Sequence, residues 1–263
     1  MLPEERNAFL KKNAQLARQY RKTLPYQMYL KQRKLYAKSR KISELRCICK
    51  KKNMKYDLND NYVQTLIESN CYFCNREINK TTYDMSFICR NNIDRGYVKN
   101  NVIPVCPNCC IMKSSSLKLD FIHKILYISD NLNIINLPSI RKNKYKALFM
   151  FTYNKYSISE NIYKSKAKKR GIDYQLSSLE FDFLTNKQCC YYCNIYHDKI
   201  GIDRINSFNS DNDKKSPYKK DNCVPCCKIC NYIKREIDYD EFIQQCKNIS
   251  IHTLNKLKAK KKN

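Results

Sequence analysis

The 263-residue sequence contains few glycines and lacks long apolar runs. It has three glycines and no tryptophan, but 21 tyrosines. A collagen-like chain needs far more glycine, and a disordered chain has far fewer large apolar side chains, so both classes are excluded. No apolar run reaches the roughly 18 residues that a membrane-spanning helix requires. We therefore expect no membrane partner.

An apolar secretory segment is also missing. Residues 1–22 are polar, whereas a signal peptide contains a continuous apolar region. We therefore expect a protein that is not secreted and that occupies a reducing intracellular compartment, such as the cytoplasm, the nucleus or a viral particle. Disulfides are disfavoured there, so paired cysteines indicate metal binding first.

Acidic residues are scarce as well. The 24 Asp and Glu residues face 51 Lys and Arg residues, which gives a net charge of +27. Such a surface repels itself unless a polyanion neutralises it. The polyanion we expect is nucleic acid, DNA more than RNA, and the oligomeric state stays open. An anionic membrane surface is the weaker alternative.

The positive charge is concentrated in two segments. Residues 1–55 hold 17 basic and 3 acidic residues, and residues 140–170 hold ten and one. Tyrosines are interleaved with the cations. A solvated helix face is the alternative, but two such segments favour contact with phosphates. The cations expected to bind nucleic acid here are Lys51, Lys52, Lys168, Lys169 and Arg170.

The chain contains an internal repeat. A shift of 121 residues brings eleven identical residues into register within a window of 33, without a gap. Convergence on composition would not keep this register, so we infer tandem duplication. The identities include the pairs Asn101 and Asn222, Cys106 and Cys227, Cys109 and Cys230, and Lys113 and Lys234.

The repeat and the charge pattern predict an α+β fold with two tandem zinc-stabilised modules, joined and preceded by basic α-helices. Segments between the cysteine pairs are typical of β-hairpins. Helices are expected over 4–22, 26–52, 59–69 and 177–186, and after the second cysteine pair of each module. The predicted regions are a basic helical N-terminal region (1–55), a first module (56–130), a basic helical linker (131–172), a second module (173–250) and a basic tail (251–263).

Each module carries two Cys-x2-Cys pairs. In the first module 31 residues separate Cys74 from Cys106, and in the second 33 residues separate Cys193 from Cys227. Two such pairs can close a tetrahedral zinc site of four thiolates. Four protein ligands leave no open position, so we predict two structural zinc ions. The predicted ligands are Cys71, Cys74, Cys106, Cys109, Cys190, Cys193, Cys227 and Cys230.

Two alternatives remain open for these cysteines. Cys189 could replace Cys190 as a ligand, and Cys226 could replace Cys227, because each pair is adjacent in the sequence. Buried, reduced cysteines without a metal are the alternative for the whole set.

The second module contains Gly201-Ile-Asp203-Arg204-Ile-Asn206, followed by Pro217-Tyr218-Lys-Lys-Asp-Asn222-Cys-Val-Pro225-Cys-Cys227-Lys-Ile-Cys230-Asn231-Tyr-Ile-Lys234. This pattern resembles HNH-type endonucleases of the ββα-metal class, above all their zinc-knuckle branch common in phages and large DNA viruses. The resemblance covers both modules, about 100 of the 263 residues. It implies ββα modules and, where the site is intact, phosphodiester hydrolysis with one Mg²⁺ or Mn²⁺.

In the second module the resemblance assigns a role to each matching residue. Asp203 and Asn231 would hold the catalytic metal ion, and Asn222 would pin the loop. Lys234 would face phosphate, and its repeat partner Lys113 would do the same in the first module.

Arg204 stands where the family has its base histidine. Arginine cannot accept a proton, but it can clamp a phosphate. The base would then come from elsewhere. Tyr218 is one candidate, although an unperturbed pKa near 10 makes tyrosine a poor base, and His197 is another.

The first module departs further from the pattern. Ile88-Cys89-Arg90 aligns with Ile202-Asp203-Arg204, and Cys110 stands where the second module has Asn231. Thiols are poor Mg²⁺ ligands. Asp94-Arg95 offers an alternative register. In either register we expect the first module to be catalytically inactive and kept for shape or binding, with Arg90 contacting nucleic acid.

These observations predict an HNH-like nucleic-acid-binding protein; whether it is an enzyme stays open, and if it is active, the second module is a metal-dependent nicking endonuclease. The alternative is a non-catalytic zinc protein that packages or scaffolds DNA or RNA in a virion or ribonucleoprotein. A zinc-built protein-interaction module is weaker, because such modules interleave their ligands.

Overall fold

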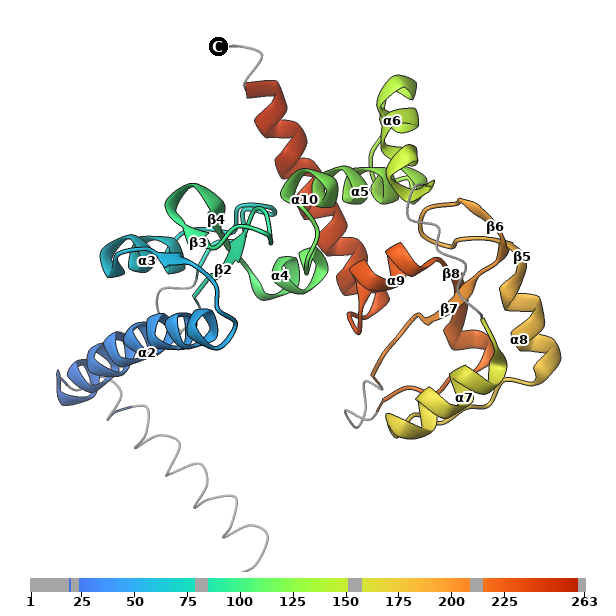
Figure 1. Cartoon of the computed structure of the whole chain (residues 1–263), viewed down its shortest axis with the longest axis horizontal. Coiled ribbons are helices and arrows are strands. Elements are labelled where there is room, and N and C mark those ends of the chain that lie inside the picture. Colours follow the sequence, from blue (N-terminus) through green and yellow to red (C-terminus); the bar gives the residue numbers. More distant parts are fainter. Residues whose placement is uncertain (1–18, 20–23, 79–84, 151–157, 209–214, 260–263) are drawn as a thin grey trace, which may run out of the picture.

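The computed structural model describes residues 19, 24–78, 85–150, 158–208 and 215–259. The helix expected over 4–22 lies outside this set except for residue 19. Two modules lie next to each other, with the long helix α2 (Leu24–Lys51) beside the first (Figure 1). The mixture of helices with small sheets confirms the predicted α+β class.

The first module begins with β1 (Tyr56–Asp57) and α3 (Asp60–Ile67). The hairpin strands β2 (Phe87–Arg90) and β4 (Val102–Val105) pair antiparallel, while β1 pairs in parallel with β3 (Tyr97–Val98). A 3-10 turn over Lys99–Asn101 leads into β4. Helices α4 (Pro107–Lys113) and α5 (Lys118–Asn131) complete the module.

The second module follows a similar order and contains one further hairpin. Helices α6 (Ser139–Met150) and α7 (Glu160–Lys169) lead to α8 (Ser178–Thr185) and the hairpin of β5 (Asn186–Cys189) with β6 (Tyr196–Lys199). Strand β7 (Gly201–Arg204) pairs antiparallel with β8 (Cys223–Cys226). A 3-10 turn over Lys220–Asn222 precedes β8, and α9 (Lys228–Lys234) and α10 (Tyr239–Ala259) follow it.

Local sequence signals explain where several of these elements begin. Ser177 and Glu180 form a capping box at the start of α8, and the Asn59 side chain caps α3. Both devices satisfy backbone N–H groups that the first helical turn leaves unpaired. Pro107 stands in the first turn of α4, where its missing N–H costs nothing. The short helices predicted over 59–69 and 177–186 are confirmed.

The strand register confirms the internal repeat. Cys89 pairs with Ile103, and Asp203 pairs with Val224, which is residue 103 shifted by 121. Cys89 therefore occupies the position of Asp203, as the first alignment predicted. The alternative based on Asp94-Arg95 is wrong, because these residues lie in the loop after β2.

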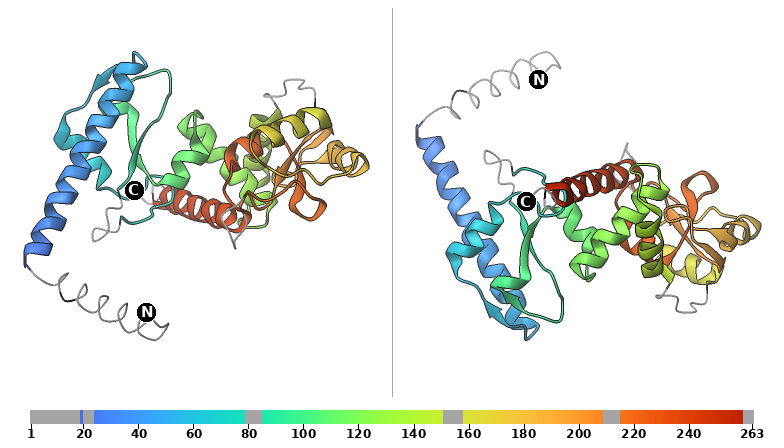
Figure 2. Two further views of the ribbon diagram at one scale, coloured as in Figure 1. Left: turned by 90° about the horizontal axis from the view of Figure 1, so that it is seen from below. Right: turned by 90° about the horizontal axis from the view of Figure 1, so that it is seen from above.

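Equivalent helices of the two modules pack against each other. Helix α5 contacts α10, and α4 contacts α9; Figure 2 shows α10 lying across the junction between the modules. Ser250 donates a hydrogen bond to its own repeat partner, Ser129, over 2.9 Å. Contacts between equivalent residues are the mark of a two-fold relationship, so the modules resemble the two halves of a dimer.

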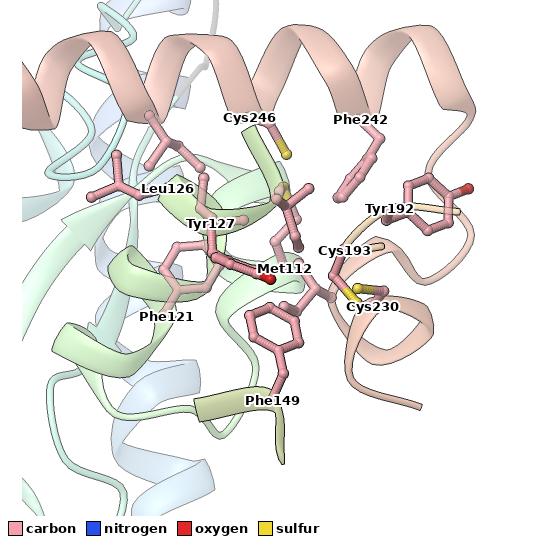
Figure 3. Packing of buried hydrophobic residues seen from close by; sticks show 14 of the residues in the cluster. Met112, Phe121, Leu126, Tyr127, Phe149, Tyr192, Cys193, Cys230, Phe242 and Cys246 are labelled. Carbon is pink, nitrogen blue, oxygen red and sulfur yellow. The ribbon is translucent and has the colours of Figure 1, made fainter. Parts of the chain in front are cut away.

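The main hydrophobic core lies at this junction. Phe121, Tyr127 and Phe149 approach it from the first module and linker, and Tyr192 and Phe242 approach it from the second (Figure 3). Two smaller clusters lie at the outer ends of the modules, around Ile67 and around Ile202. Because the central cluster takes side chains from both modules, their stabilities are coupled.

None of the helices in the described ranges is long and apolar enough to cross a membrane.

Two candidate zinc centres and the sites beside them

The four predicted ligands of each module come together. In both sets the sulfur atoms lie within 4.8 Å of one another. The Cys74 and Cys106 sulfurs are 3.7 Å apart, and those of Cys193 and Cys227 are 3.8 Å apart. Zinc bonds of about 2.3 Å in a tetrahedron require sulfur–sulfur edges of about 3.8 Å. The geometry therefore fits zinc in both modules.

The first pair of each centre lies on a tight turn. The residue after each pair is an asparagine with positive φ, 58° at Asn75 and 52° at Asn194. Asparagine tolerates this region better than most residues. The turn is closed by a hydrogen bond from the Asn194 N–H to the Cys190 carbonyl, 2.8 Å long, and by the matching bond at Asn75.

The second pair of each centre lies at a helix start, where Cys106 and Cys227 are the N-cap residues of α4 and α9. The Cys227 sulfur accepts a hydrogen bond from the Cys230 N–H at 3.4 Å. Donors at a helix start stabilise negative charge on sulfur. The alternative ligands Cys189 and Cys226 are not part of the cluster.

A residue of the second module completes the surroundings of the first centre. Gln245 of α10 donates from Nε2 to the Cys109 sulfur at 2.9 Å. Asn108, beside that centre, donates to Glu241 at 2.7 Å. Partners of metal ligands orient them and tune their affinity. Sequence analysis missed Gln245, because only the packing of α10 brings it across the junction.

Asp203 forms a buried ion pair. Its Oδ2 atom lies 3.0 Å from Lys234 Nζ and accepts a hydrogen bond of 2.8 Å from the Tyr192 hydroxyl. Asp203 is 5% exposed and Lys234 is 0% exposed. Burial raises the pKa of the Asp203 carboxyl, and the nearby Lys234 charge opposes this shift. A metal ion at Asp203 would lie close to the Lys234 ammonium group and would be repelled by it.

The burial of the two repeat-related lysines argues against their predicted phosphate contacts. Lys234 also donates to the Arg204 carbonyl at 2.8 Å, which fixes it beneath β7. Lys113 is 1% exposed, and burial lowers its pKa. The last turn of each helix packs against the hairpin, so these lysines face inward. In the sequence, each lysine directly follows an apolar residue that proves to be buried, Met112 or Ile233. This was the one sequence feature that could have indicated that the lysines are buried.

Arg204 braces its own loop. It donates to the carbonyls of Ser207, at 3.1 Å, and Ser216, and its guanidinium lies 5.3 Å from the Tyr218 ring centre. It is only 4% exposed, which argues against the predicted phosphate clamp. Tyr218 is buried as well, and burial raises its pKa. The raised pKa makes Tyr218 a still poorer base.

Arg90 repeats this arrangement in the first module. It donates to the carbonyls of Ile93 and Arg95, and it lies 5.3 Å from the Tyr97 ring centre. Arg90 is only half-buried, so its predicted contact with nucleic acid stays a prediction.

Asn222 pins the loop, as predicted. Its side chain accepts from the Asn206 N–H at 2.9 Å and donates to the Asn206 and Pro217 carbonyls. Asn101 does the same in the first module, where it accepts from the Asn92 N–H at 2.9 Å and donates to three backbone carbonyls. Identity at this repeat position therefore reflects one loop geometry.

The remaining candidates are Asn231 in α9, His197 in β6 and the basic residues at the ends of α2 and α7. Asn231 donates to the Ile202 carbonyl at 3.3 Å, which brings it beside β7. His197 is buried in β6, outside the Asp203 contacts described above. The five predicted basic residues at the ends of α2 and α7 are all exposed, and Arg170 pairs with Glu236.

Comparison with known proteins finds similarity to a viral protein. The chain is 29% identical over 228 residues to Uncharacterized protein R423 of Acanthamoeba polyphaga mimivirus, an alignment that covers 85% of the chain and 39% of that protein. The chain thus spans well under half the length of this relative. No family model matches the chain, and no solved structure matches it.

Proposed function

We propose that this protein binds nucleic acid through two tandem HNH-like modules, each held together by a structural zinc ion, and that neither module cleaves its ligand. The exposed basic ends of α2 and α7 support the binding, and the buried ion pair of Asp203 with Lys234 in the second module argues against cleavage. The role that we infer is packaging or scaffolding of DNA or RNA.

The surroundings of the two positions predicted to hold a catalytic metal ion argue against cleavage. Mg²⁺ keeps several waters and binds through accessible carboxylates, whereas the Asp203 carboxylate is buried and already neutralised. In the first module the equivalent positions are the thiols of Cys89 and Cys110. Among the described residues, the groups of three or more candidate metal ligands are the two four-cysteine sets.

The basic helix ends support nucleic-acid binding. Lys51 and Lys52 close α2 and begin the turn before β1, and Lys168 and Lys169 occupy the matching place at the end of α7. Each module thus presents an exposed basic helix end at the same point of its fold. Cations fixed on helices can replace the counterions of a phosphate backbone.

A salt titration tests the binding. Fluorescence anisotropy with a labelled 30-base-pair DNA and an RNA duplex of the same sequence measures affinity against salt concentration. Each lost phosphate contact should reduce the log–log slope by about 0.9. We expect Lys168→Gln with Lys169→Gln to reduce it by up to about twice that value. The matched control replaces Lys220 and Lys247, exposed lysines outside the two basic segments 1–55 and 140–170. Salt-independent or undetectable binding would overturn the proposal.

The second candidate function is a nicking endonuclease. The observation that favours it is the approach of Asn231 in α9 to β7, which carries Asp203. Supercoiled plasmid with Mg²⁺ or Mn²⁺ distinguishes the two functions. We expect the plasmid to be bound and shifted but not nicked. Nicking that disappears in Asn231→Ala would establish the enzyme instead. Asn231 suits this test because, unlike Asp203, its loss leaves no buried cation unpaired.

A further inference from the structure

Two cysteines of the first module lie close together outside the zinc centre. Cys89 is on β2 and Cys110 is on α4, and their sulfur atoms are 3.0 Å apart. Both residues are half-buried, unlike the fully buried zinc-ligand candidates Cys106 and Cys109. Cys110 follows the ligand Cys109, but one helical residue turns the side chain by about 100°. The pair therefore faces β2 rather than the metal.

The separation does not fit a shared zinc ion. The ligand sulfurs of the two centres are 3.7 and 3.8 Å apart, as tetrahedral zinc requires. At 3.0 Å the Cys89 and Cys110 sulfurs are too close for that geometry. A disulfide bond of about 2.05 Å needs a further approach of only about 1 Å.

The surroundings of the pair also disfavour a metal ion. Within the described residues, neither Cys89 nor Cys110 belongs to a group of three or more candidate ligands. The buried Lys113 interacts electrostatically with both sulfurs. A cation beside the pair repels a metal ion and has no such effect on a neutral disulfide.

The repeat shows what a bond at this place would do. In the second module β7 and α9 are held together by the ion pair of Asp203 with Lys234. In the first module Cys89 replaces the aspartate, and no ion pair of Lys113 is present among the described residues. A covalent link from β2 to α4 would tie the same two elements together.

We propose that Cys89 and Cys110 form a reversible intramolecular disulfide, separate from the zinc ligands, by exchange with a low-molecular-weight disulfide such as oxidised glutathione. The thiolate of one cysteine attacks the glutathione disulfide, which gives a mixed disulfide and releases one reduced glutathione. The second cysteine thiolate attacks the mixed disulfide and releases the other. The two thiol protons end on the two glutathione molecules, so atoms and electrons balance.

Redox titration of the full-length, zinc-loaded chain tests this assignment. The chain is equilibrated in buffers of varying reduced and oxidised glutathione, blocked with N-ethylmaleimide, digested and analysed by tandem mass spectrometry. Zinc content is measured on the same samples. We expect a linked Cys89–Cys110 peptide to accumulate as oxidised glutathione increases, while both zinc ions stay bound.

Matched variants separate this bond from other thiol chemistry. Cys89→Ser and Cys110→Ser should each abolish the link, whereas Cys47→Ser and Cys189→Ser, at exposed cysteines, should leave it unchanged. The assignment is overturned if maleimide still labels both Cys89 and Cys110 in oxidising buffer. It is also overturned if Cys89 links to Cys106 or Cys109 with loss of zinc. Neither outcome depends on whether the protein binds nucleic acid.

Discussion

At the scale of single residues, identical side chains at equivalent positions of the two modules have different partners. Lys113 and Lys234 occupy the same repeat position and are both buried. Lys234 has a carboxylate at 3.0 Å, whereas the carboxylate position beside Lys113 is a cysteine. Burial of a charge is costly unless it is paired, so the two lysines should contribute differently to stability.

We expect Lys234→Met to destabilise the protein by about 3–5 kcal/mol, because it leaves the Asp203 carboxylate buried without its partner. Lys113→Met should be neutral or stabilising, because it removes a buried cation that lacks a carboxylate. Urea unfolding followed by circular dichroism measures both variants under the same conditions. Equal losses in the two variants would contradict this difference.

The pH dependence of the Lys113 effect has a definite sign. Burial lowers the pKa of Lys113 from its usual 10.5, so between the two pKa values the unfolded chain binds more protons at this residue. The cost of burying Lys113 is therefore full below the lowered pKa and disappears as pH rises towards 10.5. Any stability advantage of Lys113→Met over the unsubstituted chain should shrink with rising pH. A constant or growing difference in unfolding midpoints would show that Lys113 does not titrate in this way.

At the scale of elements, each hairpin depends on a loop that closes on its own side chains. Asn222 bonds to backbone groups on both sides of the loop, and Arg204 donates to carbonyls further along it. The same two devices recur at Asn101 and Arg90. The two modules therefore share the hairpin and these side-chain contacts, whereas the sequences of their loops differ.

Asn222→Ala should destabilise the second module by about 1–3 kcal/mol, because buried backbone groups lose their hydrogen-bond partner. Hydrogen exchange should accelerate at Asn206, whose N–H the Asn222 side chain accepts. Asn161→Ala, at an exposed position of α7, is the control and should change neither quantity. An unchanged exchange rate at Asn206 would mean that the loop keeps its conformation without the Asn222 hydrogen bonds.

At the scale of the whole molecule, the two modules share one core and one pseudo-two-fold junction. The central cluster contains zinc ligands of both centres, together with residues of α5 and α10. Lys256 of α10 reaches the Tyr72 carbonyl of the first module at 3.1 Å. Loss of zinc from either module should therefore lower the stability of the other module as well.

Gln245→Ala offers the sharpest test of this coupling. The side chain belongs to the second module but donates to the Cys109 sulfur of the first. Loss of such a partner typically weakens metal affinity about 10–100-fold, so zinc at the first centre should bind more weakly while the second is unchanged. Competition with a chromogenic chelator measures both sites, and Gln244→Ala, its exposed neighbour, is the control. Equal weakening at both sites would contradict a local role for Gln245.

The sequence by itself determined the α+β class, the repeat and both four-cysteine sets. These features depend on local spacing, which survives duplication: the Cys-x2-Cys turns, the helix caps and the hairpin pattern are each encoded within a few residues. The loop role of Asn222 could be predicted for the same reason, because its partners are neighbours in the chain.

Only the tertiary structure decided which charged residues are on the surface. Lys113, Lys234 and Arg204 look like phosphate ligands in the sequence, yet all three are buried. Packing of hairpin against helix covers the two lysines, and Arg204 is enclosed by its own loop. Helix α10 likewise carries Gln245 to a metal centre 136 positions away in the chain. Burial and long-range contacts depend on how helices and strands pack against one another. The spacing of residues along the sequence does not show which element will cover a given side chain, so these features could not be predicted.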